Sequence, residues 1–391
     1  MTHTTSRSRI QPFRVMDLLA QANALEAAGH DIVHLEAGQP GSPAPERVRH
    51  AAQRVLESGS IGYTEGLGMP ALRARIARHY GERYDLDVAP ARIVITTGSS
   101  AGFILAFLAR FDDRARVAVT APYYPAYPNI LTALGYEPVI VPTDRDTAFQ
   151  PTAALLQAAQ VDLQGLMVAS PANPTGAMIE PGELAQIAAY CDDRGIGLIS
   201  DEIYHGITYG KTEQTALRLG NDVMVLNSFS KYYCMTGWRI GWLVAPEPYL
   251  PAIERLAQNL YISPPTIGQV AALESFACLD ELDDKVAIYR QNRDYLLREL
   301  PRIGFGPIAP ADGAFYLDVD VAHLTDNTEA FCRAMLTDIG VAATPGVDFD
   351  VGRRALHVRF SYAGTPDRMR EAVKRMGPWL ADRTRQTAAG G

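Results

Sequence analysis

The stretch Asn227–Trp242, NSFSKYYCMTGWRIGW, places one lysine, Lys231, among hydroxyl and aromatic side chains directly after the apolar run Val223–Leu226. A run this short and wholly apolar is typical of a strand that is buried on both faces of a parallel sheet. In open sheets of this kind, ligands bind beyond the carboxyl ends of the strands. Lys231 is therefore expected at a functional edge.

Six similar runs indicate further strands: Ile93–Thr96, Val117–Thr120, Pro138–Val141, Gly165–Ala169, Gly197–Ser200 and Gly241–Val244. Helical patterns such as Ala101–Ala109 and Glu183–Cys191 lie between them. The alternation predicts an α/β fold with a mostly parallel central sheet flanked by helices.

The pattern changes after about Pro264. Helices are expected over Ile267–Leu279, Asp284–Leu300 and Pro366–Leu380, and short strands near Ala314–Val319 and Ala355–Phe360. This mixture predicts a smaller α+β domain. We expect residues 46–284 to form the large domain, and residues 1–45 to fold back onto residues 285–391 to form the small one.

Composition narrows the functional classes. The chain has 391 residues and a net charge of −8, which argues against a general nucleic-acid binder. No apolar run reaches the ~18 residues of a membrane span, and the start MTHTTSRSRIQPF has no apolar signal-peptide core. The four cysteines lie far apart, as expected for reduced thiols in a cytoplasmic enzyme, and no Cys/His cluster predicts a metal site.

The segments that follow five of the strands contain side chains that could bind a ligand or react with it. Thr97–Ala101 is a Gly/Ser turn that opens a helix and could hold an anion or simply cap the helix. Ala121–Tyr127 offers aromatic rings for stacking or for loop packing, and Ser170–Gly176 offers the Asn173 amide or a plain turn. Asp201 and Glu202 follow the next strand, and a carboxylate at either position needs a cationic partner if it is buried. Lys231 follows the last of the five strands. Together these groups suit a flat, phosphorylated, basic heteroaromatic aldehyde, a description that pyridoxal 5'-phosphate fits.

At these residues the sequence resembles the class I/II aminotransferases, the fold type I family of pyridoxal phosphate enzymes. The resemblance covers nearly the whole chain and lies in LEAGQPG (35–41), GYTEGLGMPALR (62–73), TTGSSAGF (96–103), PYYPAY (122–127), SPANPTG (170–176), SDEIY (200–204), SFSKYYCMTGWRIGW (228–242) and VRFSYA (358–363). Each motif is short, but the ordered set is specific.

The resemblance implies roles around the cofactor ring. Lys231 matches the Schiff-base lysine, which also moves the proton between the substrate Cα and the cofactor. Asp201 matches the aspartate that pairs with the pyridine nitrogen, whereas Glu202 is the less expected partner. Asn173 and Tyr204 match the two donors to the phenolic oxygen.

Other residues match ligands of the phosphate, the ring face and the substrate. Ser99, Ser100, Ser228 and Arg239 match phosphate contacts, and Tyr124 matches the ring stacked on the pyridine face, with Tyr123 and Tyr127 as less secure alternatives. Arg359 matches the arginine that binds the substrate α-carboxylate, with Gly38 beside it and Arg353 and Arg354 as solvated neighbours. Tyr63 matches a tyrosine that reaches the cofactor of the other subunit, which implies a homodimer with shared sites.

Three other interpretations compete with this one. Gly66–Ala71 matches the dinucleotide pattern G-x-G-x-x-A, but no strand precedes it, and Pro70 suits the first turn of a helix. A PLP-binding regulator would need a DNA-binding domain, for which there is no room before the first motif. A β-lyase or cyclase acting on an α-amino acid would use the same lysine and ring, so the motifs leave that reaction open beside transamination.

The sequence indicates the substrate less specifically than it indicates the cofactor. Some dicarboxylate-specific relatives have a lysine near the position of Ser100, and this chain lacks it. Pro12–Met16 and Tyr261–Ser263 offer apolar surface for a substrate side chain, with Arg14 as an exception. We therefore expect a donor with an apolar or small side chain and a 2-oxo acid such as 2-oxoglutarate or pyruvate as acceptor.

Overall fold

A seven-stranded sheet forms the centre of the computed structural model, which describes residues 5–350 and 355–389. The strands are β2 (Ile93–Thr96), β3 (Arg116–Ala121), β4 (Glu137–Pro142), β5 (Gly165–Ala169), β6 (Gly197–Asp201), β7 (Val223–Ser228) and β8 (Gly241–Val244). Their order across the sheet is β2-β8-β7-β6-β5-β3-β4. Every residue of β2, β6, β7 and β8 is buried, as the continuous apolar runs predict.

The sheet is parallel except for β8, so the predicted mostly parallel α/β fold is confirmed. Strand β8 follows β7 through a loop without a long crossover helix, and a chain that returns so directly pairs antiparallel. Because β2 is also antiparallel to β8, it runs in the same direction as β7. The carboxyl ends of β2, β3, β5, β6 and β7 therefore share one edge with the start of β8.

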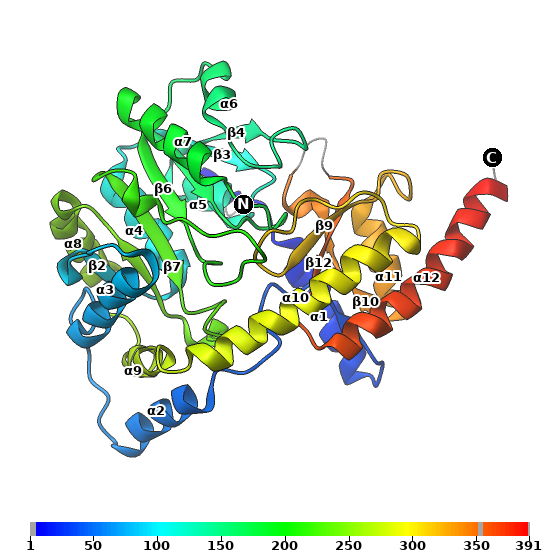
Figure 1. The fold of residues 1–391 in the computed structure, drawn as a ribbon, viewed down its shortest axis with the longest axis horizontal. Coiled ribbons are helices and arrows are strands. Elements are labelled where there is room, and N and C mark those ends of the chain that lie inside the picture. The colour runs from blue at the N-terminus through cyan, green and yellow to red at the C-terminus, as the bar shows by residue number, and fades with distance from the viewer. Residues whose placement is uncertain (1–4, 351–354, 390–391) are drawn as a thin grey trace.

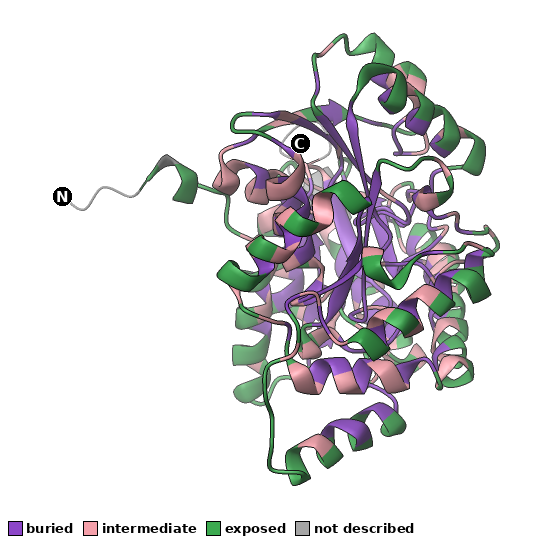
Figure 2. Cartoon of the chain, turned by 90° about the vertical axis from the view of Figure 1, so that its left-hand side faces the viewer, coloured by how far each residue is buried: buried purple, intermediate pink, exposed green. Residues whose placement is uncertain are grey.

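Helices cover both faces of this sheet (Figure 1). The helices in this part of the chain are α2 (Glu46–Glu57), α3 (Pro70–Tyr84), α4 (Gly98–Arg110), α5 (Ala126–Leu134), α6 (Ala153–Ala158), α7 (Pro181–Arg194), α8 (Leu250–Leu260) and α9 (Thr266–Ser275). Of these, α2 lies apart from the sheet and packs on α9. Figure 2 shows the strands as a buried centre and the helices with an exposed outer side. Short 3-10 helices add η1 (Ser6–Ser8), η2 (Pro90–Arg92), η3 (Ala216–Arg218), η4 (Thr236–Trp238), η5 (Glu247–Tyr249) and η6 (Gly346–Asp348).

A smaller antiparallel sheet, of order β11-β12-β9, lies beside the C-terminal helices. Its part of the chain contains α10 (Leu279–Arg302), β9 (Tyr316–Asp320), α11 (Thr328–Ile339), β10 (Val341–Ala342), β11 (Thr344–Pro345), β12 (His357–Ser361) and α12 (Pro366–Ala389). The N-terminal β1 (Val33–His34) pairs with β10, and α1 (Arg14–Ala27) packs on β10 and β11. The domain division stays a prediction, and its boundary at residue 284 falls inside α10.

Two absences hold for residues 5–350 and 355–389. No helix there is both long and apolar enough to cross a membrane. In the same residues, no group of three His, Cys, Asp or Glu side chains is arranged to hold a metal ion.

Candidate active site

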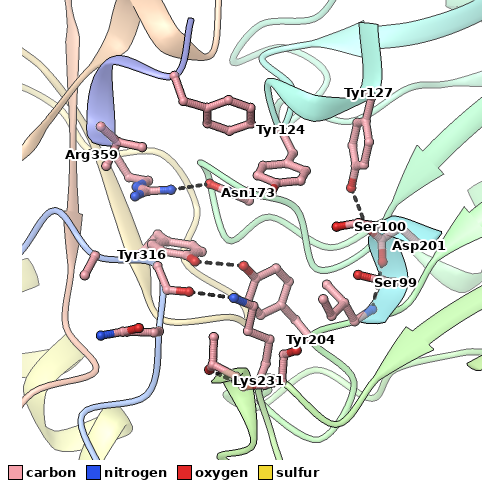
Figure 3. Close-up of a pocket in the computed structure, with 18 of the residues that line it drawn as sticks. Ser99, Ser100, Tyr124, Tyr127, Asn173, Asp201, Tyr204, Lys231, Tyr316 and Arg359 are labelled. Atoms are coloured by element: carbon pink, nitrogen blue, oxygen red, sulfur yellow. Dashed lines mark hydrogen bonds between the residues drawn. The ribbon is translucent and has the colours of Figure 1, made fainter. Parts of the chain in front are cut away.

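A cavity of about 340 Å³ opens at the shared edge of the central sheet, between that sheet and the small one (Figure 3). It is lined by Phe13, Val15, Met16, Leu19, Ala37, Gly38, Gln39, Ser99, Ser100, Phe103, Tyr124, Tyr127, Asn173, Asp201, Ile203, Tyr204, Ser230, Lys231, Thr236, Arg239, Tyr316 and Arg359. Its size lies in the range that is usual for small-molecule and cofactor sites.

Most of the residues singled out in the sequence meet in this cavity. Those that line it are Gly38, Ser99, Ser100, Tyr124, Asn173, Asp201, Tyr204, Lys231, Arg239 and Arg359. Ser228 does not: its hydroxyl lies behind the lining, where it donates to the Ile240 carbonyl and contacts Ser230, which does line the cavity. Tyr63 is 81% exposed and lies outside the cavity of its own chain, while Arg353 and Arg354 fall outside the described residues.

Lys231 reaches the cavity from the loop that follows β7. Its Nζ donates to the Gly38 carbonyl at 2.6 Å. Burial, together with the charges of Arg359 and Arg239, lowers the pKa of Lys231 to about 8, although the Asp201 carboxylate opposes the shift. An amine with that pKa is neutral in roughly one molecule in ten at pH 7, so Lys231 can act as a nucleophile and as a base near neutral pH.

Asp201 ends β6 and is buried in the wall of the cavity. Its Oδ2 accepts a hydrogen bond from Tyr127 at 2.5 Å and its Oδ1 accepts one from the Ile203 amide at 3.0 Å. Burial raises the pKa of Asp201 to about 6, although both donors and the Lys231 charge pull it down. The carboxylate is thus ionised at neutral pH and can receive a cationic group in the cavity.

Glu202, the alternative carboxylate, points away from the cavity. Its Oε1 accepts hydrogen bonds from the Ala216 amide at 2.8 Å and from the Thr215 hydroxyl at 3.2 Å. Burial raises the pKa of Glu202 to about 8. Successive side chains of a strand alternate between its faces, and here the alternation leaves Asp201 as the carboxylate in the cavity.

The N-terminus of α4 and Arg239 form a cradle for an anion. Thr97 makes no side-chain cap at this helix, so the first-turn N–H groups are not occupied by a capping side chain. A Cβ at Gly98 would clash with Nη2 of Arg239, so glycine at this position leaves room for the guanidinium beside the start of α4. Free N–H groups, the Ser99 and Ser100 hydroxyls and a guanidinium suit a phosphate group.

Arg359 is held on β12 by groups from distant parts of the chain. Its Nη1 donates to Asn173 Oδ1 at 2.9 Å, and its Nη2 donates to the Glu36 carbonyl at 2.6 Å and to the Thr344 hydroxyl at 3.1 Å. Its Nε is buried and has no partner among the described residues. Arg359 is 4% exposed, and its guanidinium has no carboxylate partner in these contacts, which suits it to bind a substrate carboxylate.

Tyr316 is a site residue that the sequence argument did not identify. It is fully buried on β9, its hydroxyl lies 2.8 Å from that of Tyr204, and the Arg359 guanidinium lies 4.4 Å from its ring centre. Figure 3 shows it between Arg359 and Tyr204. Its position depends on the pairing of β9 with β12, for which the sequence carries no local signal.

One wall of the cavity is apolar. Phe13, Val15, Met16 and Leu19 form it from the first turns of α1 and the residue before them, and the Phe13 ring packs edge-on against Tyr124 at 5.9 Å. The expectation for Pro12–Met16 therefore agrees with the structure at Phe13, Val15 and Met16, and Arg14 instead pairs with Glu329. The segment Tyr261–Ser263 does not line this cavity, so that part of the expectation is wrong for the single chain; Ile262 is 51% exposed at the surface.

Comparisons with known proteins agree with this geometry. The sequence model of the family described as aminotransferase class I and II matches residues 30–376. The chain is 48% identical to the valine–pyruvate aminotransferase of Mycobacterium tuberculosis over 378 residues, which cover 96% of this chain and 97% of the relative. A crystal structure of an aminotransferase from Mycobacterium tuberculosis superposes with a TM-score of 0.94 at 47% identity, covering 98% of this chain and 100% of the other. Aspartate aminotransferase from Thermus thermophilus with maleate superposes with a TM-score of 0.89 at 30% identity, covering 97% of this chain and 100% of the other.

Proposed function

Because the chain belongs to the class I and II aminotransferases, which use pyridoxal 5'-phosphate, we propose that it moves the amino group of a branched apolar α-amino acid, with valine as the type, to a small 2-oxo acid such as pyruvate. When bound, the cofactor supplies an aldehyde that takes up the amino group and a ring that accepts the electrons of the substrate Cα–H bond. The protein supplies binding, orientation and proton transfer.

The cavity residues divide this work. The α4 N-terminus and Arg239 would hold the phosphate, the Asp201 carboxylate would pair with the ring nitrogen and favour its protonated form, and Asn173 and Tyr204, which also line the cavity, would donate to the phenolic oxygen. The N–H groups of the Arg359 guanidinium, whose Nε has no partner among the described residues, would bind the substrate α-carboxylate. Lys231 Nζ would take the proton from the substrate Cα and hold it for the next transfer.

The preference for an apolar donor rests on one observation, which is the distribution of charge in the cavity. Its cationic lining residues are Lys231, Arg239 and Arg359, and each has one of the roles above. No further cation lines the part of the cavity formed by described residues, whereas Phe13, Val15, Met16 and Leu19 offer apolar contact. A second carboxylate on the substrate would be desolvated there without a partner.

A panel of amino donors with pyruvate tests the proposal. We expect kcat/KM for valine to exceed that for alanine by on the order of 10-fold, because two further carbons are buried at about 0.8 kcal/mol each. Aspartate should be at least about 100-fold poorer than valine, because its second carboxylate loses water without gaining a cation. Comparable rates with aspartate would show that a cation outside the described lining serves this side chain and would refute the apolar preference.

A reaction with the amino donor alone distinguishes transamination from the β-lyase or cyclase alternative. With an amino acid and no 2-oxo acid, a transaminase stops after one equivalent of the pyridoxamine form per site, and a lyase continues. Family membership and the valine–pyruvate relative favour transfer, so we expect a single equivalent of 2-oxo acid per site. Continued product formation would favour the lyase.

We propose that the enzyme acts as a homodimer in which Tyr63 serves the partner's cavity. Tyr63 is 81% exposed, and its neighbour Ile61 is 48% exposed. The Gly62 carbonyl accepts a hydrogen bond from Thr266, which places this loop close to the segment that carries exposed Leu260 and Ile262. Exposed apolar side chains gathered in this way are typical of a protein interface.

Mixed subunits test the shared site. Tyr63→Phe should weaken cofactor binding on the order of 10-fold, the loss of one hydrogen bond to a charged group. A hybrid of Tyr63→Phe with Lys231→Ala then contains one complete site, and at limiting cofactor it should regain about half of the wild-type activity. A hybrid no more active than the Tyr63→Phe parent, or a monomer in sedimentation, would contradict the proposal.

We also propose that the enzyme works in the cytoplasm. Its four cysteines are free thiols and three of them are buried, as suits a reducing compartment. Fractionation of cells with an antibody against the chain would test this, and recovery from an oxidising compartment would contradict it.

A further inference from the structure

We propose that Asp348 is a positioning residue that sets the substrate preference, because it fixes the apolar wall of α1 to the segment that holds Arg359. This inference rests on the proposed function. It concerns a residue that lies outside the cavity lining.

Asp348 acts as the missing cap of α1. The helix begins at Arg14, and its N-cap residue Phe13 makes no side-chain hydrogen bond. Instead, Asp348 Oδ1 accepts the Arg14 amide at 3.2 Å and Oδ2 accepts the Val15 amide at 2.9 Å, across more than 330 residues of sequence. The Asp348 side chain is 1% exposed, and the Arg14 guanidinium lies 3.9 Å from it. A buried carboxylate that satisfies two first-turn N–H groups holds a helix end firmly in place.

The same short segment holds the other side of the substrate site. Thr344 accepts a hydrogen bond from Arg359, and the Phe349 ring lies 4.8 Å from the Arg359 guanidinium. The Phe349 carbonyl accepts the Tyr123 amide at 3.0 Å, next to the ring of Tyr124. Thr344–Phe349 therefore contacts the group for the substrate carboxylate, the loop of the aromatic ring and the apolar wall.

Loss of the Asp348 contacts would change the position of α1 relative to Arg359 and would leave the reacting groups unchanged. A donor is fixed at its α-carboxylate by Arg359, and its side chain must then meet Val15 and Met16. If α1 is not fixed relative to Arg359, the apolar contact is lost, while the groups that bind the cofactor and move the proton stay in place. Substrates with a larger apolar side chain should suffer most.

Asp348→Ala tests this with valine and alanine as donors. We expect KM for valine to rise on the order of 10-fold, as for the loss of a helix cap, with kcat within about twofold. KM for alanine should change by less than about threefold, so that the valine-to-alanine ratio of kcat/KM falls. Asp348→Asn keeps one acceptor oxygen and should recover part of the loss.

Two controls separate this role from a general loss of stability. Thr152→Ala removes the cap of α6, where Thr152 accepts the Leu155 amide, and should lower the melting temperature without changing the valine-to-alanine ratio. Arg14→Ala removes the ion pair but keeps both N–H groups, and should leave the ratio near that of the wild type. An unchanged ratio in Asp348→Ala, or an equal change in Thr152→Ala, would overturn the proposal.

Hydrogen exchange distinguishes failure of this inference from failure of the proposed function. In Asp348→Ala, the amides of the first turns of α1 should exchange at least about 10-fold faster than in the wild type, and those of α6 should not. This readout holds whether or not valine is the donor. Unchanged exchange in α1 would refute the role of Asp348 even if the substrate panel supports valine.

Discussion

Replacement of Lys231 by Ala is expected to lower kcat by roughly 10⁴-fold or more, because one side chain serves both as nucleophile and as the base at the substrate Cα. The cofactor should still bind, because Arg239, Asp201 and the α4 N-terminus are unchanged. Initial rates at saturating donor and acceptor, together with a cofactor titration, measure the two effects separately.

Lys211→Ala is the matched control. Lys211 lies outside the cavity and pairs with Glu180 and Asp312, so its loss should leave the rate within about twofold of the wild type. A Lys231→Ala enzyme with near wild-type turnover, or an equal loss in the Lys211 variant, would contradict the assignment of Lys231.

Replacement of Asp201 by Ala is expected to lower kcat/KM by on the order of 10² to 10³, since it removes a buried charge from beside the cofactor ring. Asp201→Asn keeps the shape but not the charge and should lose nearly as much. A Glu202→Gln variant is the control, because Glu202 points away from the cavity, and it should change stability more than kcat. Equal losses in both positions would mean that the two carboxylates have been assigned wrongly.

The charge of Asp201 also predicts a pH dependence of cofactor binding to the cofactor-free protein. The pKa of Asp201 is raised to about 6, mainly by burial, so the carboxylate takes up a proton and binding weakens as the pH falls through that value. Tyr127→Phe removes a donor that stabilises the ionised form. The pKa should therefore rise, and the midpoint of binding should move upward by up to about one pH unit.

Comparing the two proteins cancels the titration of the cofactor's own phosphate, which lies near pH 6 in both. A midpoint that does not move, or that moves to lower pH, would show that the Tyr127 hydroxyl does not stabilise the ionised Asp201.

The strands of the fold could be predicted where burial on both faces requires a run of apolar residues. Val223–Leu226 is apolar throughout, and Gly197–Ser200 has no charged residue and ends in a serine, because both faces of their strands are covered. The observed strand β7 extends the first run by two residues, and β6 extends the second by one. The antiparallel direction of β8 was not predicted, since a buried strand has the same composition in either direction.

Site residues could be predicted where a polar or ionisable side chain directly follows a buried strand. Ser99, Ser100, Asn173, Asp201 and Lys231 each follow a buried run, and the structure brings them to one cavity. The choice between Asp201 and Glu202 could not be made from burial, because β6 is covered on both sides; the structure turns Asp201 into the cavity.

The features of the site that the sequence did not predict depend on contacts between segments that are far apart in the chain. Tyr316 depends on the register of β9 against β12, and Asp348 meets α1 from the far end of the chain. Ser228 was expected to face the phosphate, but its hydroxyl bonds the Ile240 carbonyl, an interaction that depends on the loop returning to form β8. None of these contacts leaves a local pattern in the sequence.

Reduction of the cofactor-loaded enzyme with borohydride, followed by peptide mapping, tests the central claim most directly. The chain has four lysines, Lys211, Lys231, Lys285 and Lys374, so the site of attachment can be assigned without ambiguity. We predict that the mass of the reduced cofactor is found on the peptide that contains Lys231 and on no other. Attachment to any of the other three lysines, or no attachment at all, would contradict the account.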